Sequence, residues 1–308
     1  MSRRFEPGLL NDRISRRRAL QVGAVGAAGA MGLAVARPGL AGAQQSTPTA
    51  AAGGLLPDNR LLLYYGFPGN DRMGILGEYE PAELLAKLQA EAENYKAVDS
   101  SRPWKLGFEL IASVAQGSPQ SDNSWVSDTD KKWLDLYTKF TGDNDLVLFL
   151  DVQMGFKKPK DDYSGLTPWL AEPHVHLGID PEFHMRGDER PGEDFGQIDG
   201  ADVTEAQNWL VDLSAKNNIS RKTLIVHQFR YSMIENKDKI SPVNGVDLVI
   251  DEDGFGPPNQ KRDTYDVVIK QEPIEFNGIK LFYKQDDPMM TPQEIMTLDP
   301  VPDVVIFQ

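Results

Sequence analysis

The sequence contains no cysteine, and this absence excludes several kinds of chemistry. The protein can form no disulfide, offers no thiolate to a metal ion or a substrate, and carries no lipid on a cysteine. A Gly-x-Ser-x-Gly elbow is also missing, so a serine nucleophile is not supported. The first predicted strand is followed by Gly66-Phe67-Pro68-Gly69, which lacks the glycine spacing of a dinucleotide-binding loop.

An apolar run long enough to span a membrane is missing as well, and an apolar segment of moderate length lies near the amino terminus. Ser15-Arg16-Arg17-Arg18-Ala19-Leu20 resembles a twin-arginine export signal, although the pattern has a bulky apolar residue where Ala19 stands. The apolar segment Val22–Val35 follows, and its 14 residues fall short of the ~20 that a membrane span needs. Ala41-Gly42-Ala43 fits a small-residue cleavage site. We therefore expect residues 1–43 to be a cleaved signal peptide, without stable membrane insertion afterwards.

Basic residues are scarce in the chain that would remain. Cleavage after Ala43 leaves 265 of the 308 residues and takes the totals from 32 basic and 46 acidic residues to 25 and 44, a net charge of −19. Such a chain is repelled by nucleic acid and by anionic membrane surfaces. We expect export through the twin-arginine translocase to the cell envelope or the exterior, and the oligomeric state stays open.

Residues 44–56 are rich in Ser, Thr, Pro, Ala and Gly and predict a disordered linker, and residues 57–308 predict one domain. Short apolar runs alternate with helical patterns there. The expected strands are Leu61–Tyr65, a strand within Leu106–Ala115, Leu146–Leu150, a strand around His176–Ile179, Thr223–Val226, Val246–Ile250, Ile279–Tyr283 and Val304–Phe307. Eight such strands predict a single α/β domain, a (β/α)8 TIM-like barrel whose eighth helix is missing. An open doubly wound sheet is the alternative.

Helix boundaries are also predicted. Pro81 begins a helix to about Val98, whose apolar residues recur every three or four positions. Ser127 with Asp130 predicts the start of a second helix, Asp202 the start of a third, and Thr291 with Glu294 a capping box for a short last helix. Tyr265–Lys270 is assigned to a helix between the sixth and seventh strands, and residues 185–201 predict a long loop.

Polar side chains follow most of the predicted strands. In a parallel barrel the residues after the strands build the active site. The candidates for that mouth are Tyr65, Gln116, Asp151, Gln153, Asp180, Glu182, His227, Gln228, Asp251, Asp253, Lys284 and Asp286. Crowded carboxylates repel one another, so one of a pair keeps its proton near neutrality. That is the requirement for a general acid beside an ionised partner, as in glycoside hydrolysis.

Asp180-Pro181-Glu182 resembles the Asp-x-Glu at the end of the fourth strand of chitinase-like and muramidase-like barrel hydrolases. The resemblance implies that Glu182 is the proton donor and that Asp180 positions it or the substrate. Val175 and Gly178 stand where the chitinase pattern has further acids, so the likeness is limited to this short motif.

A broader likeness covers most of the predicted barrel. The chain resembles a group of exported bacterial proteins with no assigned activity, and this likeness implies the barrel fold without implying a reaction. The stretches that carry it are Tyr64–Gly69, Asp180–Phe183, Val226–Phe229, Asp253–Pro258 and Lys280–Asp286.

Four histidines are available for a metal site. His174 and His176 lie at the start of the fourth strand, which is the wrong end of a barrel for a catalytic metal, so we expect a structural role for them. His184 and His227 lie on the mouth side and could hold a divalent metal together with acids such as Asp180, Glu182 and Asp251. No ligand spacing is diagnostic, so no cofactor is predicted and a divalent metal stays an alternative.

These observations lead to one hypothesis and two alternatives. The hypothesis is an exported glycoside hydrolase that binds a glycan or a small molecule, with Glu182, Asp180 and Asp251 as catalytic residues. The residues expected to bind the substrate are Tyr65, Gln116, Asp151, Gln153, His227, Gln228, Asp253 and Lys284. The alternatives are a metal-dependent hydrolase of phosphoesters or amides, and a non-catalytic cell-envelope binding protein on a degenerate barrel.

Overall fold

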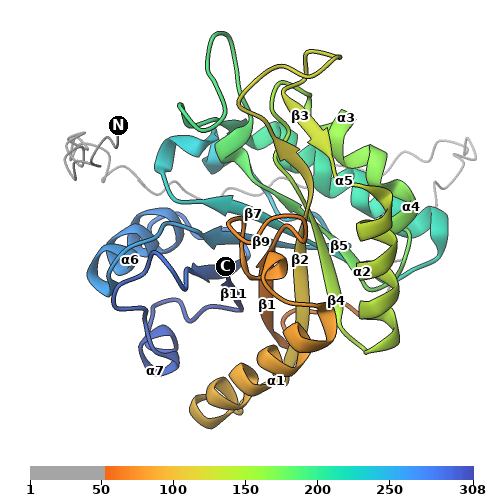
Figure 1. Ribbon diagram of the computed structural model, residues 1–308. Helices are drawn as coiled ribbons and strands as arrows, with labels where there is room; N and C mark the ends of the chain where they lie inside the picture. The colour runs from red at the N-terminus through yellow and green to blue at the C-terminus, as the bar shows by residue number, and fades with distance from the viewer. Residues whose placement is uncertain (1–52) are drawn as a thin grey trace, which may run out of the picture. The chain divides into compact units, whose positions relative to one another are not determined.

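The structure is a computed structural model that describes residues 53–308, and its centre is a closed parallel barrel (Figure 1). Each barrel strand pairs in parallel with the next one along the chain, and the last pairs with the first. The strands are β1 (Arg60–Gly66), β2 (Trp104–Ala115), β4 (Val147–Val152), β5 (Val175–Ile179), β7 (Lys222–Gln228), β9 (Val246–Glu252), β10 (Phe276–Leu281) and β11 (Val304–Phe307). The predicted barrel is confirmed, and the open-sheet alternative is wrong because β1 pairs with both β11 and β2.

Helices connect most of these strands and pack around the barrel (Figure 1). They are α1 (Pro81–Val98), α2 (Lys131–Asp143), α3 (Pro159–Tyr163), α4 (Thr167–Leu170), α5 (Gly200–Asn217), α6 (Pro258–Tyr265) and α7 (Pro292–Ile295). A π-helical turn, Asp266–Lys270, extends α6. Between β7 and β9 the described chain has only the single turns Tyr231–Met233 and Lys237–Lys239 and the two-residue strand β8 (Ile234–Glu235).

The strands are apolar on both faces because each face packs against a different core. In β1, Leu61, Leu63 and Tyr65 belong to the cluster inside the barrel. Leu62 and Tyr64 alternate with them and belong to the cluster between the barrel and the helices. A parallel strand covered on both sides therefore needs a nearly continuous apolar run, which is why the sequence pattern located these strands.

Two predicted helix starts are corrected by the structure. Ser127 does not begin α2, because it lies in the short strand β3 (Val126–Asp128), which pairs antiparallel with β2. The cap is Asp130 alone, whose side chain accepts the Lys132 N–H. Likewise Asp202 lies within the first turn of α5, and its cap is Asp199. The long loop before α5 consequently ends at β6 (Ile198–Asp199), which pairs with β8.

The amino-terminal part of the domain packs into the end of the barrel at which the strands begin. Leu56, assigned to the linker from sequence, is buried in the interior cluster, and its N–H donates to Asp247. Asp247 in turn pairs with Arg221 at 2.6 Å. The predicted signal peptide and most of the linker lie outside the described residues. Within residues 53–308, none of the helices combines the length and the apolar character that crossing a bilayer requires.

The predicted capping box of α7 is confirmed. The Thr291 hydroxyl accepts the Glu294 N–H at 3.3 Å, and the Glu294 carboxylate accepts the Thr291 N–H at 2.9 Å. Thr291→Ala should lower the free energy of unfolding by about 1 kcal/mol, because an orphan N–H loses its acceptor. Urea denaturation measures this, and Thr291→Ser, which keeps the hydroxyl, should stay within about 0.5 kcal/mol of the parent.

Candidate functional site

The inward-facing residues of the barrel change from apolar to ionisable at the carboxyl ends of the strands. This layer is buried: every member is 7% exposed or less. Its members are Tyr65, Glu109, Asp151, Asp180, His227, Asp251, Asp253 and Lys280, and we refer to them as the mouth cluster. Parallel strands all end at the same rim, which brings together residues that are far apart in the sequence.

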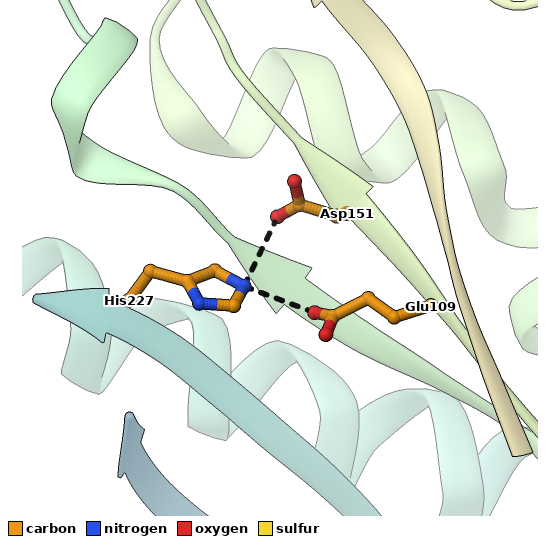
Figure 2. A group of neighbouring side chains, drawn as sticks. All are labelled: Glu109, Asp151 and His227. Atoms are coloured by element: carbon orange, nitrogen blue, oxygen red, sulfur yellow. Dashed lines mark hydrogen bonds and ion pairs between the residues drawn. The ribbon is translucent and has the colours of Figure 1, made fainter. Parts of the chain in front are cut away.

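His227, on β7, lies at the centre of the mouth cluster, and its Nε2 faces Glu109 of β2 and Asp151 of β4 (Figure 2). Its Nε2 is 3.0 Å from Glu109 Oε1 and 4.0 Å from Asp151 Oδ1. Its Nδ1 is 3.0 Å from Asp251 Oδ2 and 3.8 Å from Asp253 Oδ2. Both ring nitrogens therefore face carboxylates.

Tyr65 and Lys280 complete the cluster on the side of β1 and β10. The Tyr65 hydroxyl donates to Asp151 Oδ2 at 2.9 Å, and the Tyr65 ring packs edge-on against His227 with centroids 5.9 Å apart. The Lys280 ammonium lies 3.4 Å from the centroid of the Tyr65 ring, a cation–π contact that is strong where water is excluded. Tyr65 thus links the acid on β4 to the cation on β10.

Two glycines make room for the buried carboxylates. A Cβ at Gly178 would lie 2.7 Å from Glu109 Oε1 and 3.1 Å from Asp151 Oδ1. A Cβ at Gly278 would lie 2.5 Å from Asp251 Oδ1. Glu109 of β2 and Asp151 of β4 therefore fill the space beside Gly178 on β5.

The charges in the cluster shift the pKa values of its members. Burial raises the pKa of Asp151 to about 6, and the charge of His227 works against this shift. Burial likewise raises the pKa of Asp251 to about 6, against the hydrogen bond and charge of His227. Burial alone would lower the pKa of His227, but the charge of Glu109 and the bonds to Asp251 and Glu109 raise it well above its ordinary value.

Glu182 differs from the other acids because it is only partly buried. It lies in the single turn Pro181–Phe183 that follows β5, and Asp180 caps this turn by accepting the Glu182 N–H at 3.1 Å. Because the chain turns here, Glu182 is not part of the extended strand β5. Burial, followed by the charge of Asp253, raises the pKa of Glu182 to about 7, and burial with the charge of Asp151 raises that of Asp180 well above its usual range.

The end of the predicted long loop packs directly on this turn. The Gly196 N–H donates to the Glu182 carbonyl at 2.7 Å. A Cβ at Gly196 would come within 2.4 Å of the His184 carbonyl, so only glycine allows this close approach. Phe195, the preceding residue, is held by the Arg230 guanidinium 3.7 Å from its ring centroid. The loop is thereby fixed between the turn after β5 and the segment after β7.

Four residues predicted to bind the substrate lie away from the mouth cluster. Gln153 accepts the Ala115 N–H, and Gln116 donates to the Val114 carbonyl. Gln228 points to the opposite face of β7 from His227, where it accepts from Lys237 at 2.7 Å. Lys284 is exposed and pairs with Glu78 at 2.6 Å. Tyr65, Asp151, His227 and Asp253 are brought together as expected, as are Asp180 and Asp251 from the predicted catalytic set.

Sequence reasoning missed Glu109 and Lys280. Each is the single charged residue well inside an otherwise apolar stretch, Phe108–Ala112 for Glu109 and Ile279–Phe282 for Lys280. A charge inside a strand that is covered on both faces must be paired or bound to a metal. That rule is the sequence signal for both residues, which lie inside their strands and not at the strand ends.

Among residues 53–308, Glu109, Asp151 and His227 form a group that could hold a metal ion, with ligand atoms that all lie within 4.8 Å of one another. His184 is not part of it, because its Nδ1 lies 2.6 Å from the Gln197 carbonyl. His176 accepts the Thr223 N–H at 3.0 Å, and His174 lies 3.0 Å from the Thr138 carbonyl. His174 and His176 thus lie near the start of β5, at the opposite end of the strand from the mouth, and each contacts a backbone group of another element.

Comparisons with known proteins add little to this geometry. No protein-family model matches the chain, and no curated protein matches it. Among solved structures, a crystal structure of D-psicose 3-epimerase in the presence of D-fructose aligns with 14% identity and a TM-score of 0.31, over 58% of this chain and 70% of that one. Likeness at this level says nothing about the reaction, and the strand pairings themselves establish the (β/α)8 barrel.

Proposed function

We propose that the protein is an exported hydrolase that cleaves a glycan at the mouth of its barrel, with Glu182 as the proton donor. The observation that carries the proposal is the combination found at Glu182: a residue that is only partly buried, lies in the turn after β5 and has a carboxyl group whose pKa burial raises to about 7. A general acid is most effective when its pKa lies near the working pH. Of the acids gathered here, the others are 7% exposed or less.

The surrounding residues provide the further groups that this reaction needs. Asp180 holds the backbone of the turn that carries Glu182, so we assign it a positioning role. Asp253, whose charge acts on Glu182, and Asp251 supply negative charge that would stabilise the oxocarbenium-like transition state of glycoside cleavage. Phe255, two residues after Asp253, is 50% exposed, and an exposed aromatic ring suits the apolar face of a sugar.

A panel of soluble and cell-wall glycans tests this proposal directly. The full chain should release new reducing ends from at least one member of the panel, measured by a colorimetric reducing-sugar assay with heat-inactivated protein as the blank. Binding without release of reducing ends would instead support the non-catalytic alternative. Export through the twin-arginine pathway is also part of the proposal. It rests on the sequence alone, since residues 1–43 lie outside the described residues.

The reaction should slow as the pH rises through about 7. A carboxyl group with a raised pKa keeps its proton below that value and loses it above, so the acid form of Glu182 disappears on the alkaline side. We expect kcat/KM, measured from about pH 5 to about pH 9, to show a descending limb near pH 7. A rate that stays constant through this range would contradict the role of Glu182 as the acid.

A further inference from the structure

The mouth cluster has more acidic than basic groups. Five of its members are carboxylic acids, Glu109, Asp151, Asp180, Asp251 and Asp253, whereas only His227 and Lys280 can carry positive charge. Buried charge that is not paired is costly, and a bound metal is one of the few ways to compensate it. The imbalance is a property of the interior, because all seven groups are at most 7% exposed.

Several carboxylate oxygens in the cluster also have no partner. Glu109 Oε2, Asp151 Oδ1, Asp251 Oδ1 and Asp253 Oδ1 are buried and accept no hydrogen bond from the described residues. A buried acceptor without a donor costs roughly 1–3 kcal/mol, and native proteins rarely leave several in one place. These oxygens therefore point to a positively charged ligand that the side chains themselves do not provide.

His227 Nε2 and the two carboxylates that face it are close to the spacing of a metal site (Figure 2). Neighbouring ligand atoms around a metal bound at about 2.1 Å lie about 3.0 Å apart in an octahedral site and about 3.4 Å apart in a tetrahedral one, and the three ligand atoms here lie within 4.8 Å of one another. His227 Nε2 is 3.0 Å from Glu109 Oε1 and 4.0 Å from Asp151 Oδ1. The three residues stand on β2, β4 and β7, so strands of the barrel and not loops hold the ligand atoms.

The other side of the His227 ring has the partner that metal-binding histidines usually have. Such a histidine almost always donates its second N–H to a carboxylate or a carbonyl, which fixes the orientation of the ring. Asp251 Oδ2 lies 3.0 Å from His227 Nδ1, and His227 is paired with Asp251 in the register of β7 and β9. Nε2 is thereby left facing Glu109 and Asp151.

We propose that Glu109, Asp151 and His227 bind one divalent transition-metal ion inside the barrel mouth, with Asp251 orienting the histidine. Two carboxylates and an imidazole suit Mn²⁺ or Zn²⁺, whereas Ca²⁺ and Mg²⁺ prefer oxygen ligands throughout. The space beside Gly178 lets the two carboxylates approach each other. The proposal does not depend on glycan hydrolysis, because it concerns binding of the ion alone.

Calorimetry on the full chain tests the metal site. The protein is stripped with a chelator, dialysed and titrated with MnCl₂ or with ZnCl₂, and CaCl₂ serves as the comparison. We expect one equivalent of Mn²⁺ or Zn²⁺ per chain, much weaker binding of Ca²⁺, and a Tm that rises with the concentration of the bound ion. Absence of binding, or binding of all three ions with equal affinity and undefined stoichiometry, would overturn the proposal.

Variants separate this site from other acidic groups. Glu109→Gln and Asp151→Asn should each weaken binding by more than about 100-fold, and Asp251→Asn by about 10–100-fold. Glu193→Gln removes an exposed acid whose side chain forms no hydrogen bond or ion pair among the described residues, and this variant should bind like the parent. If Glu109→Gln and Asp151→Asn bound the ion as tightly as Glu193→Gln, the assignment would be wrong.

Two further measurements keep these outcomes interpretable. Circular dichroism and Tm in chelator report folding, and Glu109→Gln should be at least as stable as the parent there, because it removes one charge from an overcharged interior. Glu182→Gln should bind the metal within about twofold of the parent, since Glu182 is not a ligand. Loss of hydrolysis in that variant with retained metal binding would separate the catalytic proposal from the metal proposal.

Discussion

Glu182→Gln should keep the fold of the protein and lose glycan hydrolysis by about 10²–10⁴-fold in kcat/KM, which is the contribution expected of a general acid. The substitution keeps the shape of the side chain and removes only its dissociable proton. Glu182 has no side-chain hydrogen bond within the described chain, and its backbone N–H still reaches Asp180. The turn after β5 should therefore survive, and the loss should appear in kcat more than in KM.

Two controls distinguish this role from a structural one. Glu193→Gln, eleven positions downstream in an exposed part of the loop that follows the turn, should leave the rate unchanged. A substrate with a good leaving group needs less help from an acid, so the Glu182→Gln protein should recover much of its activity on an activated aryl glycoside. Equal rates for Glu182→Gln and the parent on the natural glycan would remove the assignment.

His227→Leu should be the most destabilising single substitution at the mouth, lowering the free energy of unfolding in chelator by about 3–5 kcal/mol. The histidine lies between Glu109 and Asp251, each 3.0 Å away, and all three are 0% exposed. Its removal leaves two buried carboxylates without their partner. Urea denaturation followed by circular dichroism measures the change.

The comparison for this prediction is another histidine with a neutral partner. His174 is only partly buried and lies against the Thr138 carbonyl, so His174→Gln should cost no more than about 1.5 kcal/mol. Adding Glu109→Leu to His227→Leu should restore part of the lost stability, because the stranded charge is removed as well. If the two histidine variants were equally stable, the central place of His227 in the charge balance would be refuted.

Much of the fold could be predicted because its signals are local. Proline at the start of α1 and four buried residues on one face, Leu84, Leu88, Ala92 and Tyr95, can be recognised within eighteen residues. The apolar runs of the strands follow from burial on both faces. The start of α2 was harder to predict. Ser127 belongs to β3, which pairs with β2, and a short window of sequence does not reveal this pairing.

The candidate site was predictable only where a polar residue ends a short strand. Asp151, His227 and Asp251 satisfy that condition, and they meet. The strand β2 does not end at the rim: it extends to Ala115, has an irregular register between Ile111 and Ser113, and pairs with β3 beyond it. Glu109, within that strand, is consequently the residue at the level of the mouth, and Gln116 is carried past it.

The barrel could be predicted from the sequence by itself. Eight short apolar runs alternate with helical patterns, and each pattern follows from the local burial of its own residues. Which ionisable groups meet was decided by the tertiary structure alone. The stagger of β2 sets the depth of Glu109, alternation along β7 turns His227 inward and Gln228 outward, and the close approach at Gly178 and Gly278 leaves space for carboxylates. These are contacts between residues tens of positions apart, and their geometry exists only once the ring of strands has closed.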